Sequence, residues 1–480
     1  MDKQYFLNTF RVTVPQMEQL TKTALARGGD WSDLYFENTL YGDLLLKDGE
    51  VTSGGLHTDF GVGIRVLSGE KTGYAYSENT GENDMREAAM AASLIASGSA
   101  RTHDIPKPGK GLSPAFAPAC GGDVLYQSEI PWESIRAAEL LPFLEKLQER
   151  ISSADSRVVK IVARLAYSHS DIMMFNSDGE LTFDSRPMGS VTASVIFNYK
   201  GKTENKTASR SFRTGAELLT DSLLQELAEE AVKGIDERFE ARRPKGGRMP
   251  VVMGAGASGI LLHEAMGHAF EADFNRKGQS VFAGKIGRQV CDRSISIVDD
   301  GTVRANRGAC SFDDEGVPGQ KTWMVKDGIL NSYLHDRISA RWYGVAPTGN
   351  GRRESFRYNP IPRMRATYME SGSVPPQDIV ASVKKGIYVD EFSNGQVKIG
   401  EGDFTFYVKS GFLIENGRLT APVKDINIIG NGPQALSDIA CVGNDLKIDN
   451  GTWTCGKDQS VPVSCGIPTV LVNNLTVGGE

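Results

Sequence analysis

The sequence predicts an α+β protein in which a mixed helix and strand region precedes a large β-rich domain. In residues 1–240, short β-rich runs lie between segments whose apolar residues have helical spacing. Further along, short strands recur between Asp-Gly and Asn-Gly turns, which favour antiparallel hairpins, at Asp300-Gly301, Asp327-Gly328, Asn416-Gly417 and Asn450-Gly451. We expect residues 1–240 and 251–480 to fold as separate domains, joined by a basic linker with Gly and Pro at 241–250.

The N-terminal region shows one order of elements twice. The first half predicts a helix over Pro15–Ala26, strands at Leu34–Glu37, Asp43–Lys47, Gly61–Leu67 and Gly73–Tyr76, and a helix over Met85–Ala96. After a loop rich in Pro and Gly at 105–122, the second half predicts a helix over Trp132–Ile151, strands at Val158–Ala166, Ile172–Phe175 and Ser190–Tyr199, and an amphipathic helix over Leu218–Phe239. This order suggests an internal duplication of 1–104 and 123–240, although the two halves are not visibly alike in sequence.

Composition limits the classes of function. The chain has 480 residues, of which 40% are hydrophobic, and a formal charge of -7. Because no basic patch is evident, we expect no direct contact with nucleic acid. No run of about 18 apolar residues and no secretory signal is visible, so we expect no membrane span and a cytoplasmic location. The six cysteines, Cys120 among them, lack CxxC pairing, which fits a reducing compartment.

The most informative stretch is His263-Glu264-Ala265-Met266-Gly267-His268, which follows a predicted buried strand at Val251–Met253. Two imidazoles and an adjacent carboxylate are the parts of a zinc hydrolase site, but the spacing is one residue longer than in HExxH. Side chains five residues apart diverge by about 140° on a regular helix. To bind one metal, the backbone must widen into a π-type turn, or the helix must end near Gly267.

A catalytic zinc has three protein ligands, so His263 and His268 need a third partner. Chemistry alone allows five residues, among which spacing does not choose: Glu271, Asp273, Cys291, His335 and Cys455. Glu264 follows the first histidine directly, so it lies beside the metal and can act as general base toward the water that the metal activates.

The motif and its surroundings resemble the TldD branch of the TldD/PmbA metallopeptidase family. The likeness begins with the run from Gly259 to His268 and with Glu271-Ala272-Asp273-Phe274. It continues through 298–302, 313–320, 347–355 and 442–446 to Thr454-Cys455-Gly456-Lys457-Asp458-Gln459-Ser460, and so covers nearly all of 251–480.

The resemblance implies a zinc peptidase with the pattern HExxxH plus a distant cysteine. It places the Zn²⁺ ligands at His263, His268 and Cys455 and the catalytic acid/base at Glu264. It also implies an unfolded or extended peptide as substrate. The partner implied is either a second copy of the chain or a PmbA/TldE-like paralogue, in a dimer. Members of the family have also been described as modulators of DNA gyrase.

Two other functions stay open at this point. One is a zinc amidase or other hydrolase acting on a small molecule, and the other is a non-catalytic regulatory subunit in which zinc is structural. Glu264 discriminates between a catalytic zinc and the structural zinc of a regulatory subunit. A structural zinc site is closed and needs no base beside the metal.

Several further residues are weaker candidates. Tyr333, His335 or Tyr343 could stabilise an oxyanion. Arg352 and Arg353 could bind a peptide carboxylate, or equally hold the β domain together. The run 313–316 is interpreted as an acidic turn, because it lacks the alternating ligands of a calcium loop. The Gly-rich turn at 254–259 has no Lys-Ser/Thr continuation, which favours close backbone packing over nucleotide binding.

Overall fold

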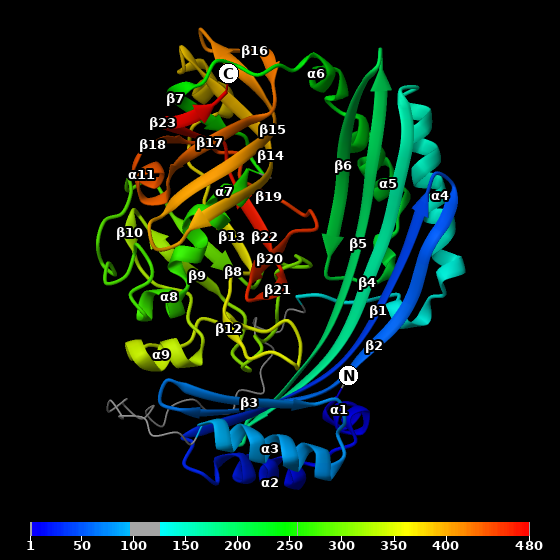
Figure 1. The fold of residues 1–480 in the computed structure, drawn as a ribbon, viewed down its shortest axis with the longest axis vertical. Coiled ribbons are helices and arrows are strands. Elements are labelled where there is room, and N and C mark those ends of the chain that lie inside the picture. Colours follow the sequence, from blue (N-terminus) through cyan, green and yellow to red (C-terminus); the bar gives the residue numbers. More distant parts are fainter. Residues whose placement is uncertain (1, 97–124, 257, 480) are drawn as a thin grey trace.

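The computed structural model describes residues 2–96, 125–256 and 258–479. The loop expected at 105–122, Cys120 and the inner boundaries of the expected duplication at 104 and 123 lie outside the described residues. The N-terminal part is one long antiparallel sheet with helices against it, and the β-rich C-terminal part lies beside this sheet (Figure 1).

The N-terminal sheet has the strand order β3-β2-β1-β4-β5-β6, so each half of the region contributes three neighbouring strands. The strands are β1 (Trp31–Lys47), β2 (Glu50–Ser68), β3 (Lys71–Ser77), β4 (Val158–Asn176), β5 (Leu181–Tyr199) and β6 (Lys202–Phe212). The helices are α1 (Lys3–Phe10), α2 (Val14–Leu25), α3 (Glu82–Ala96), α4 (Ala137–Ala154), α5 (Asp221–Val232) and α6 (Ile235–Glu240), with 3₁₀ turns η1 (Trp132–Ser134) and η2 (Ala216–Leu218).

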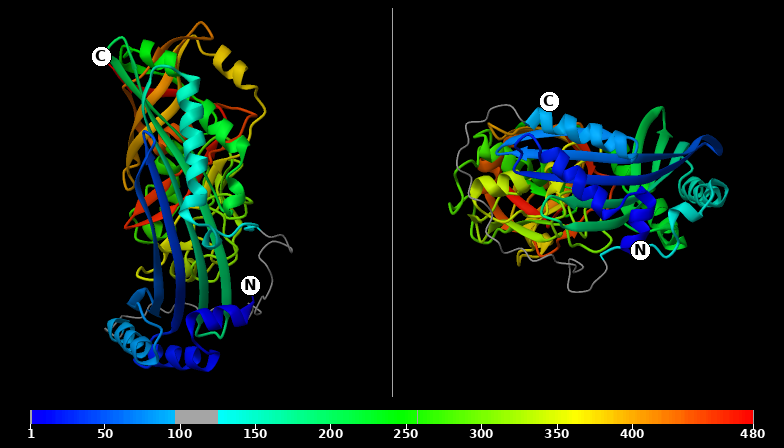
Figure 2. Two further views of the ribbon diagram at one scale, coloured as in Figure 1. Left: turned by 90° about the vertical axis from the view of Figure 1, so that its right-hand side faces the viewer. Right: turned by 90° about the horizontal axis from the view of Figure 1, so that it is seen from below.

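The helices cover one face of this sheet, because side chains two apart along a strand share a face. On β1, Leu34 and Phe36 pack with α1, α2 and α3, and Leu44 and Leu46 pack with α4. All four have even numbers and therefore share a face. Tyr35, on the opposite face, packs with Phe356 and the C-terminal domain. Figure 2 shows α4 lying along the strands, and α1 to α3 gathered at the end of the sheet that is opposite to α4.

The expected elements are present, but several have different limits. The two predicted strands within β1 are one strand, and so are the two within β4. Antiparallel neighbours pair along the whole length of these strands, and this pairing outweighs the tendency of Asn38 and Gly42 to interrupt β1. Gly42 is covered by the ring of Tyr167. The predicted helix at 218–239 is divided between α5 and α6 at Gly234, which has φ +73°. Helix α1 and strand β6 were not predicted from the sequence.

The C-terminal domain contains two larger sheets. The first has the order β10-β9-β8-β13-β22-β19, with β8 (Ile297–Asp300), β9 (Lys321–Lys326), β10 (Ile329–Leu330), β13 (Ala366–Met369), β19 (Lys447–Ile448) and β22 (Ser464–Ile467). The second has the order β14-β7-β23-β17-β15-β16, with β18 on β23; its strands are β7 (Gly247–Met253), β14 (Lys385–Lys398), β15 (Asp403–Glu415), β16 (Arg418–Val423), β17 (Ile426–Asn431), β18 (Ile439–Val442) and β23 (Val470–Gly478). The expected antiparallel pairing dominates, although β13–β22 and β14–β7 are parallel.

Smaller elements complete this domain. Two short hairpins pair β11 (Gly351–Arg352) with β12 (Ile361–Pro362) and β20 (Thr454–Lys457) with β21 (Gln459–Pro462). The remaining helices are α7 (Gly259–Leu262), α8 (Ala272–Arg276), α9 (Arg337–Tyr343), α10 (Pro376–Ala381) and α11 (Gly432–Ser437), with turns η3 (His263–Gly267) and η4 (His268–Phe270). Because α7 contacts β13 and β22 while η3 contacts β14 and β15, the histidine segment lies between the two larger sheets.

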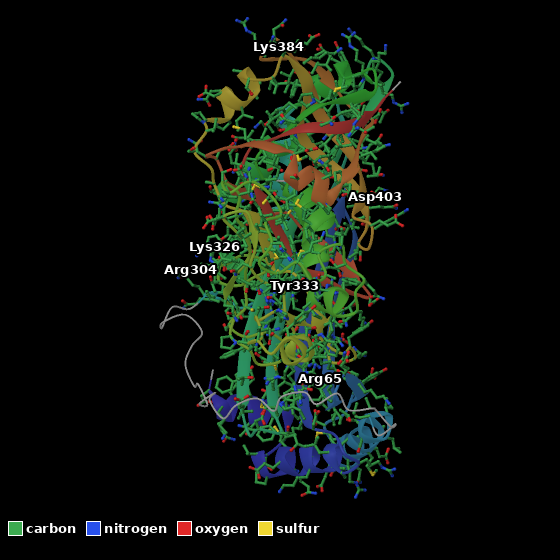
Figure 3. The ribbon with its side chains drawn as sticks, turned by 90° about the vertical axis from the view of Figure 1, so that its left-hand side faces the viewer. Arg65, Arg304, Lys326, Tyr333, Lys384 and Asp403 are labelled. Carbon is green, nitrogen blue, oxygen red and sulfur yellow. The ribbon has the colours of Figure 1, made fainter. Side chains whose placement is uncertain are left out.

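The two parts of the chain are joined by buried ion pairs. Arg65 of β2 contacts Glu315 at 2.6 Å and Asp33 at 2.7 Å, and Arg186 of β5 contacts Asp314 at 2.6 Å. In Figure 3, Arg65 lies where the N-terminal sheet meets the C-terminal domain. The acidic turn at 313–316 is therefore part of this junction.

Strand β7 starts at Gly247, so the end of the expected linker at 241–250 is already part of a C-terminal sheet. The domain limits of 1–240 and 251–480 stay a prediction. Among the described residues, none of the helices is both long and apolar enough to cross a membrane.

Candidate metal centre

The two histidines lie on one helical segment whose backbone changes type between them. Helix α7 ends at Leu262, η3 is a π-helical turn, and η4 is a 3₁₀ turn that begins at His268. The N–H of His268 donates to the carbonyl of His263, which is the five-residue bond of a π-turn. The imidazole centroids are 5.1 Å apart. Of the two backbone forms expected from the spacing of the histidines, the structure has the π-type turn.

Close packing explains the glycines around this segment. A Cβ at Gly267 would lie 2.2 Å from Sδ of Met364, and a Cβ at Gly259 would lie 2.8 Å from the backbone of Gly466 on β22. The glycines therefore let the histidine segment approach its neighbours more closely than other residues allow. The interpretation of the Gly-rich turn as a packing feature agrees with these contacts.

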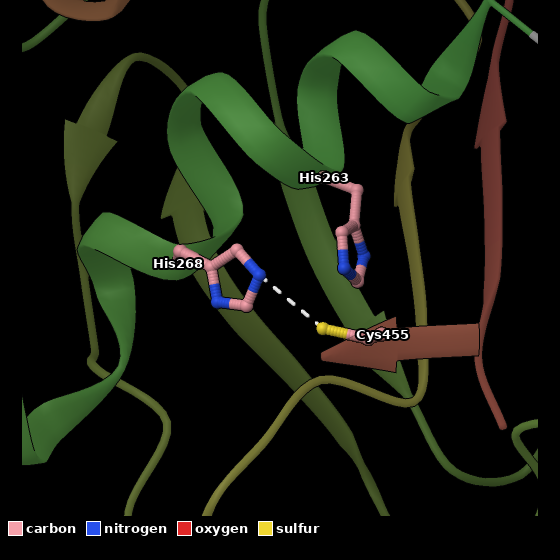
Figure 4. Close-up of side chains that lie close together, drawn as sticks. All are labelled: His263, His268 and Cys455. Atoms are coloured by element: carbon pink, nitrogen blue, oxygen red, sulfur yellow. Dashed lines mark hydrogen bonds between the residues drawn. The ribbon is translucent and has the colours of Figure 1, made fainter. Parts of the chain in front are cut away.

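His263, His268 and Cys455 come together although Cys455 is 187 residues beyond His268. One donor atom from each residue lies within 4.8 Å of the others (Figure 4). Neither ring nitrogen of the buried His263 has a hydrogen-bond partner among the described residues. Buried polar groups are normally paired. Two imidazoles and a thiol form a donor set that zinc prefers, so these residues fit a zinc ion.

The second nitrogen of His268 is held by a buried carboxylate. Nδ1 of His268 donates to Oε2 of Glu271 at 2.8 Å, while Nε2 lies 3.2 Å from Sγ of Cys455. Glu271 is fully buried, and its carboxylate lies 3.1 Å from the ammonium of Lys457. A histidine that binds metal commonly donates its other N–H to a carboxylate in this way.

The ionisable groups of this cluster shift one another's pKa values. Burial raises the pKa of Glu271, but Lys457 and His268 outweigh it and lower that pKa to about 2. Burial lowers the pKa of His268, but Glu271 and Cys455 raise it to about 10. Burial raises the pKa of the Cys455 thiol, but His263 and His268 lower it to about 4. Cys455 is therefore disposed to be a thiolate, the form that binds metals.

The hairpin that carries Cys455 is fixed by a buried arginine. Arg363 donates to the carbonyls of Cys455, Lys457 and Gln459 at 2.6, 3.2 and 2.8 Å. These bonds attach both strands of the β20–β21 hairpin to one buried side chain. The thiol is consequently held on a rigid element.

Glu264 lies beside the cluster and keeps access to solvent. Its side chain is 25% exposed, whereas that of His268 is 7% exposed. Its Oε2 is 3.9 Å from Nε2 of His268, beyond hydrogen-bonding distance. The carboxylate can therefore contact a small molecule that approaches the three donors.

The other candidates for the third ligand have different roles. Glu271 binds His268, and Asp273 accepts a bond from Lys457 at 2.8 Å. Cys291 is buried in the apolar core, where burial raises the pKa of its thiol to about 12. His335 packs edge-to-face against Tyr333 and Tyr343. In the part of the chain that the structure describes, the group of three metal-binding side chains contains none of these residues.

Of the oxyanion candidates, Tyr333 is already engaged, because its hydroxyl donates to the carbonyl of Phe282 at 2.7 Å. Burial lowers the pKa of His335 to about 4, which keeps this imidazole neutral. For Tyr343, burial raises the pKa to about 12. None of these contacts places the three side chains at the metal centre.

Arg352 and Arg353 are buried and hold the fold together. Arg352 donates to the carbonyls of Met364 and Pro462 at 2.6 and 2.8 Å. Arg353 donates to the carbonyl of Asp314 at 2.9 Å and lies 4.1 Å above the ring of Tyr35. The structural interpretation of this pair is thus favoured over substrate binding.

The acidic turn at 313–316 also has structural partners. Asp313 accepts bonds from the backbone N–H groups of Glu315, Val317 and Gly351. With Asp314 and Glu315 paired to arginines, the carboxylates are engaged by protein donors, and the interpretation as an acidic turn agrees with these contacts.

Sequence reasoning missed Lys457 and Arg363. Lys457 occurs two residues after Cys455, a spacing that puts both side chains on the same face of a strand, so a signal was present. For Arg363 the sequence contains no comparable signal, because its acceptors are backbone carbonyls almost a hundred residues away.

Comparison with known proteins identifies the family of the chain. Three sequence models match the chain: PmbA/TldA metallopeptidase domain 1 at residues 32–96, the central domain at 130–236 and the C-terminal domain at 246–479. A "Metalloprotease TldD homolog" of Haemophilus influenzae is 39% identical over 94% of both chains. The chain belongs to the TldD branch of the PmbA/TldD metallopeptidase family. It is a metallopeptidase.

A more distant relative and two solved structures are similar along nearly the whole chain. A "Zinc metalloprotease TldD homolog" of Saccharolobus solfataricus is 25% identical, over 96% of this chain and 100% of the relative. A solved structure described as a putative modulator of a DNA gyrase, from Thermotoga maritima, has a TM-score of 0.75 at 22% identity and covers 97% of this chain and 99% of its own. TldE from Thermococcus kodakarensis has a TM-score of 0.72 at 18% identity, with coverage of 97% and 100%. The structures support the fold alone.

Proposed function

We propose that this metallopeptidase is zinc-dependent and hydrolyses peptide bonds of unfolded or extended peptides. His263, His268 and Cys455 would hold the Zn²⁺, and Glu264 would be the general base. The observation that carries the proposal is the buried cluster of three donors, in which both ring nitrogens of His263 lack a partner among the described residues. The name of the Saccharolobus solfataricus relative, which includes zinc, supports the choice of metal.

When bound, zinc supplies a Lewis acid and lowers the pKa of a water toward about 7. Glu264 takes the proton of the attacking water and passes it to the leaving amine. Its partly exposed position beside His268 suits both roles, since the carboxylate must meet solvent and substrate in turn. Glu271 holds the Nδ1 proton of His268, which leaves Nε2 directed at Cys455 and the centre.

Three donors favour a catalytic site over a structural one. A structural zinc is closed by four protein ligands, whereas a catalytic zinc retains a free position. The described cluster has three such side chains, and a carboxylate lies next to it. This supports hydrolysis over a purely regulatory subunit.

The burial of the donors supports an extended substrate. His263, His268 and Cys455 are 1%, 5% and 3% exposed, so the surface of a folded protein would not reach them. An extended peptide can approach a recessed centre and be held through main-chain bonds as an added strand.

We also propose that the chain acts in the cytoplasm as a dimer, either with a second copy or with a PmbA/TldE-like paralogue. The similarity of its fold to TldE from Thermococcus kodakarensis supports such a pairing. The mass of the native complex, measured with and without a co-expressed paralogue, distinguishes the two forms.

Glu264→Gln tests the catalytic proposal. The variant should retain zinc but lose about a hundredfold to ten-thousandfold in kcat on an unfolded peptide, because the amide cannot accept the proton. Zinc content and peptide hydrolysis are measured on the same preparation, with Glu401→Gln on the surface as the control. If hydrolysis survives in Glu264→Gln, or if a chelator leaves hydrolysis unchanged in the unaltered chain, the proposal is wrong.

A further inference from the structure

Lys457 connects the strand that carries Cys455 with the carboxylate that holds His268. It lies on β20 two residues after Cys455, and alternate residues of a strand share a face. Its ammonium therefore points to the same side as the thiol. There it lies 3.1 Å from Oε2 of Glu271, the oxygen that accepts the Nδ1 proton of His268. A chain of contacts thus runs from His268 through Glu271 and Lys457 back to the strand of Cys455.

The surroundings of Lys457 hold its ammonium in place. It donates to Oδ1 of Asp273 at 2.8 Å and to the carbonyl of Pro362 at 3.1 Å, and it lies 4.3 Å from the ring centroid of Phe274. Its side chain is 7% exposed. A buried lysine with three oxygen neighbours has little freedom to move, so the position of its charge is fixed.

Removal of this charge would leave the buried carboxylate of Glu271 with His268 as its ion-pair partner among the described residues, and with the charge of Arg363 farther away. A buried charge that loses its partner is strongly unfavourable, so the side chain of Glu271 would turn toward water. The displaced carboxylate would no longer hold the Nδ1 proton of His268 in its present orientation. The tautomer and ring position of His268 would then be free to vary.

We infer that Lys457 is a positioning residue that locks Glu271 against His268 and thereby aligns His268 with Cys455 for zinc binding. The inference rests on the proposed function, since it assigns a role toward the same zinc ion. Lys457 is a cation on the same strand as the thiol ligand Cys455, and it supports the histidine ligand His268, which lies on a helical segment distant in sequence. His268 and Cys455 are therefore positioned as one unit although they are far apart in sequence.

Lys457→Met tests the inference, because methionine keeps most of the length of the side chain without the charge. In the full chain, zinc affinity is measured by competition with a chromophoric chelator, and the absorption spectrum of the Co²⁺-loaded protein is recorded. We expect zinc affinity to fall about tenfold to a hundredfold, as for other residues that support metal ligands, and the Co²⁺ spectrum to change. Lys457→Arg, which keeps the charge, should restore part of the affinity.

A double-mutant cycle with Glu271→Gln separates positioning from general stability. If Lys457 acts through Glu271, Lys457→Met should have a much smaller effect on zinc affinity in the Glu271→Gln background than in the unaltered chain. This second background also keeps the test usable if Lys457→Met alone folds poorly, because the neutral amide of Glu271→Gln places no unpaired charge in the core. Lys424→Met is the matched control, since Lys424 is a partly buried lysine paired with Glu204 away from the centre.

The outcomes separate this inference from the proposed function. Unchanged zinc affinity and an unchanged Co²⁺ spectrum in folded Lys457→Met would overturn the positioning role, as would effects that add independently of Glu271→Gln. A lower melting temperature with normal zinc affinity would likewise mean a merely structural role. If the unaltered chain binds no zinc, the proposed function itself is wrong.

Discussion

Among single residues, the thiol of Cys455 is the ligand whose loss is most informative. We expect Cys455→Ser to reduce zinc affinity by more than the tenfold to hundredfold typical of residues that support a ligand, because a hydroxyl is a poor zinc ligand at neutral pH. Zinc content after dialysis measures the effect, together with peptide hydrolysis.

Cys291→Ala is the matched control for this prediction. Cys291 is also a buried cysteine, but it lies in the apolar core and burial raises the pKa of its thiol to about 12. We expect Cys291→Ala to keep its zinc and its activity. Loss of zinc in Cys291→Ala together with retention in Cys455→Ser would show that the thiol ligand has been assigned to the wrong cysteine.

The residues of the site differ in how far the sequence reveals them. His263, Glu264 and His268 are recognisable because they are neighbours in sequence. Cys455 could be singled out from four other candidates only through the resemblance to a family, because a contact between residues 187 apart depends on the whole fold. The roles of Glu271 and Lys457 depend on burial and charge pairing, which spacing does not reveal.

At the scale of elements, the π-turn η3 depends on Gly267. A Cβ at this position would lie 2.2 Å from Sδ of Met364, which is fully buried. We expect Gly267→Ala to destabilise the fold by about 1–3 kcal/mol through overpacking and to weaken zinc binding, because the turn that returns His268 to the centre must shift. Urea unfolding and chelator competition measure the two effects.

Met364→Ala, made in the Gly267→Ala background, removes the obstructing sulfur. We expect the double variant to recover part of the zinc affinity and to show a coupling of about 0.5–3 kcal/mol in stability. Purely additive effects would mean that Met364 is not the reason for a glycine at this position.

The elements also show where local patterns are sufficient. The π-turn was one of only two backbone forms expected from the spacing, because both histidines lie on one helical segment. The full length of β1 and β4 could not be predicted, because Gly42 is tolerated only where Tyr167 covers it and neighbouring strands pair on both sides. Sheet pairing thus decides the limits of strands, whereas helix geometry decides the form of the motif.

At the scale of the whole molecule, the N-terminal sheet and the C-terminal domain are joined through buried polar groups that include Glu37. Its carboxylate accepts a bond from the hydroxyl of Thr39 and one from the backbone N–H of Phe356 in the C-terminal domain. Burial raises the pKa of Glu37 to about 7, and these hydrogen bonds oppose the shift only in part. The folded state therefore binds the proton of Glu37 more tightly than the unfolded chain does.

The sign of the pH effect follows from this raised pKa. The contribution of protonated Glu37 to stability is complete below the ordinary pKa of 4.5 and is lost as the pH rises through about 7. Glu37→Gln stays neutral at every pH and can still accept the bond from Phe356. We expect it to unfold at higher urea concentrations than the unaltered chain at pH 8, by up to about 3 kcal/mol, since one pKa unit corresponds to about 1.4 kcal/mol. Near pH 4.5 this advantage should vanish. Glu50→Gln on the exposed end of β2 is the control, and an equal gain for Glu37→Gln at both pH values would contradict the assignment.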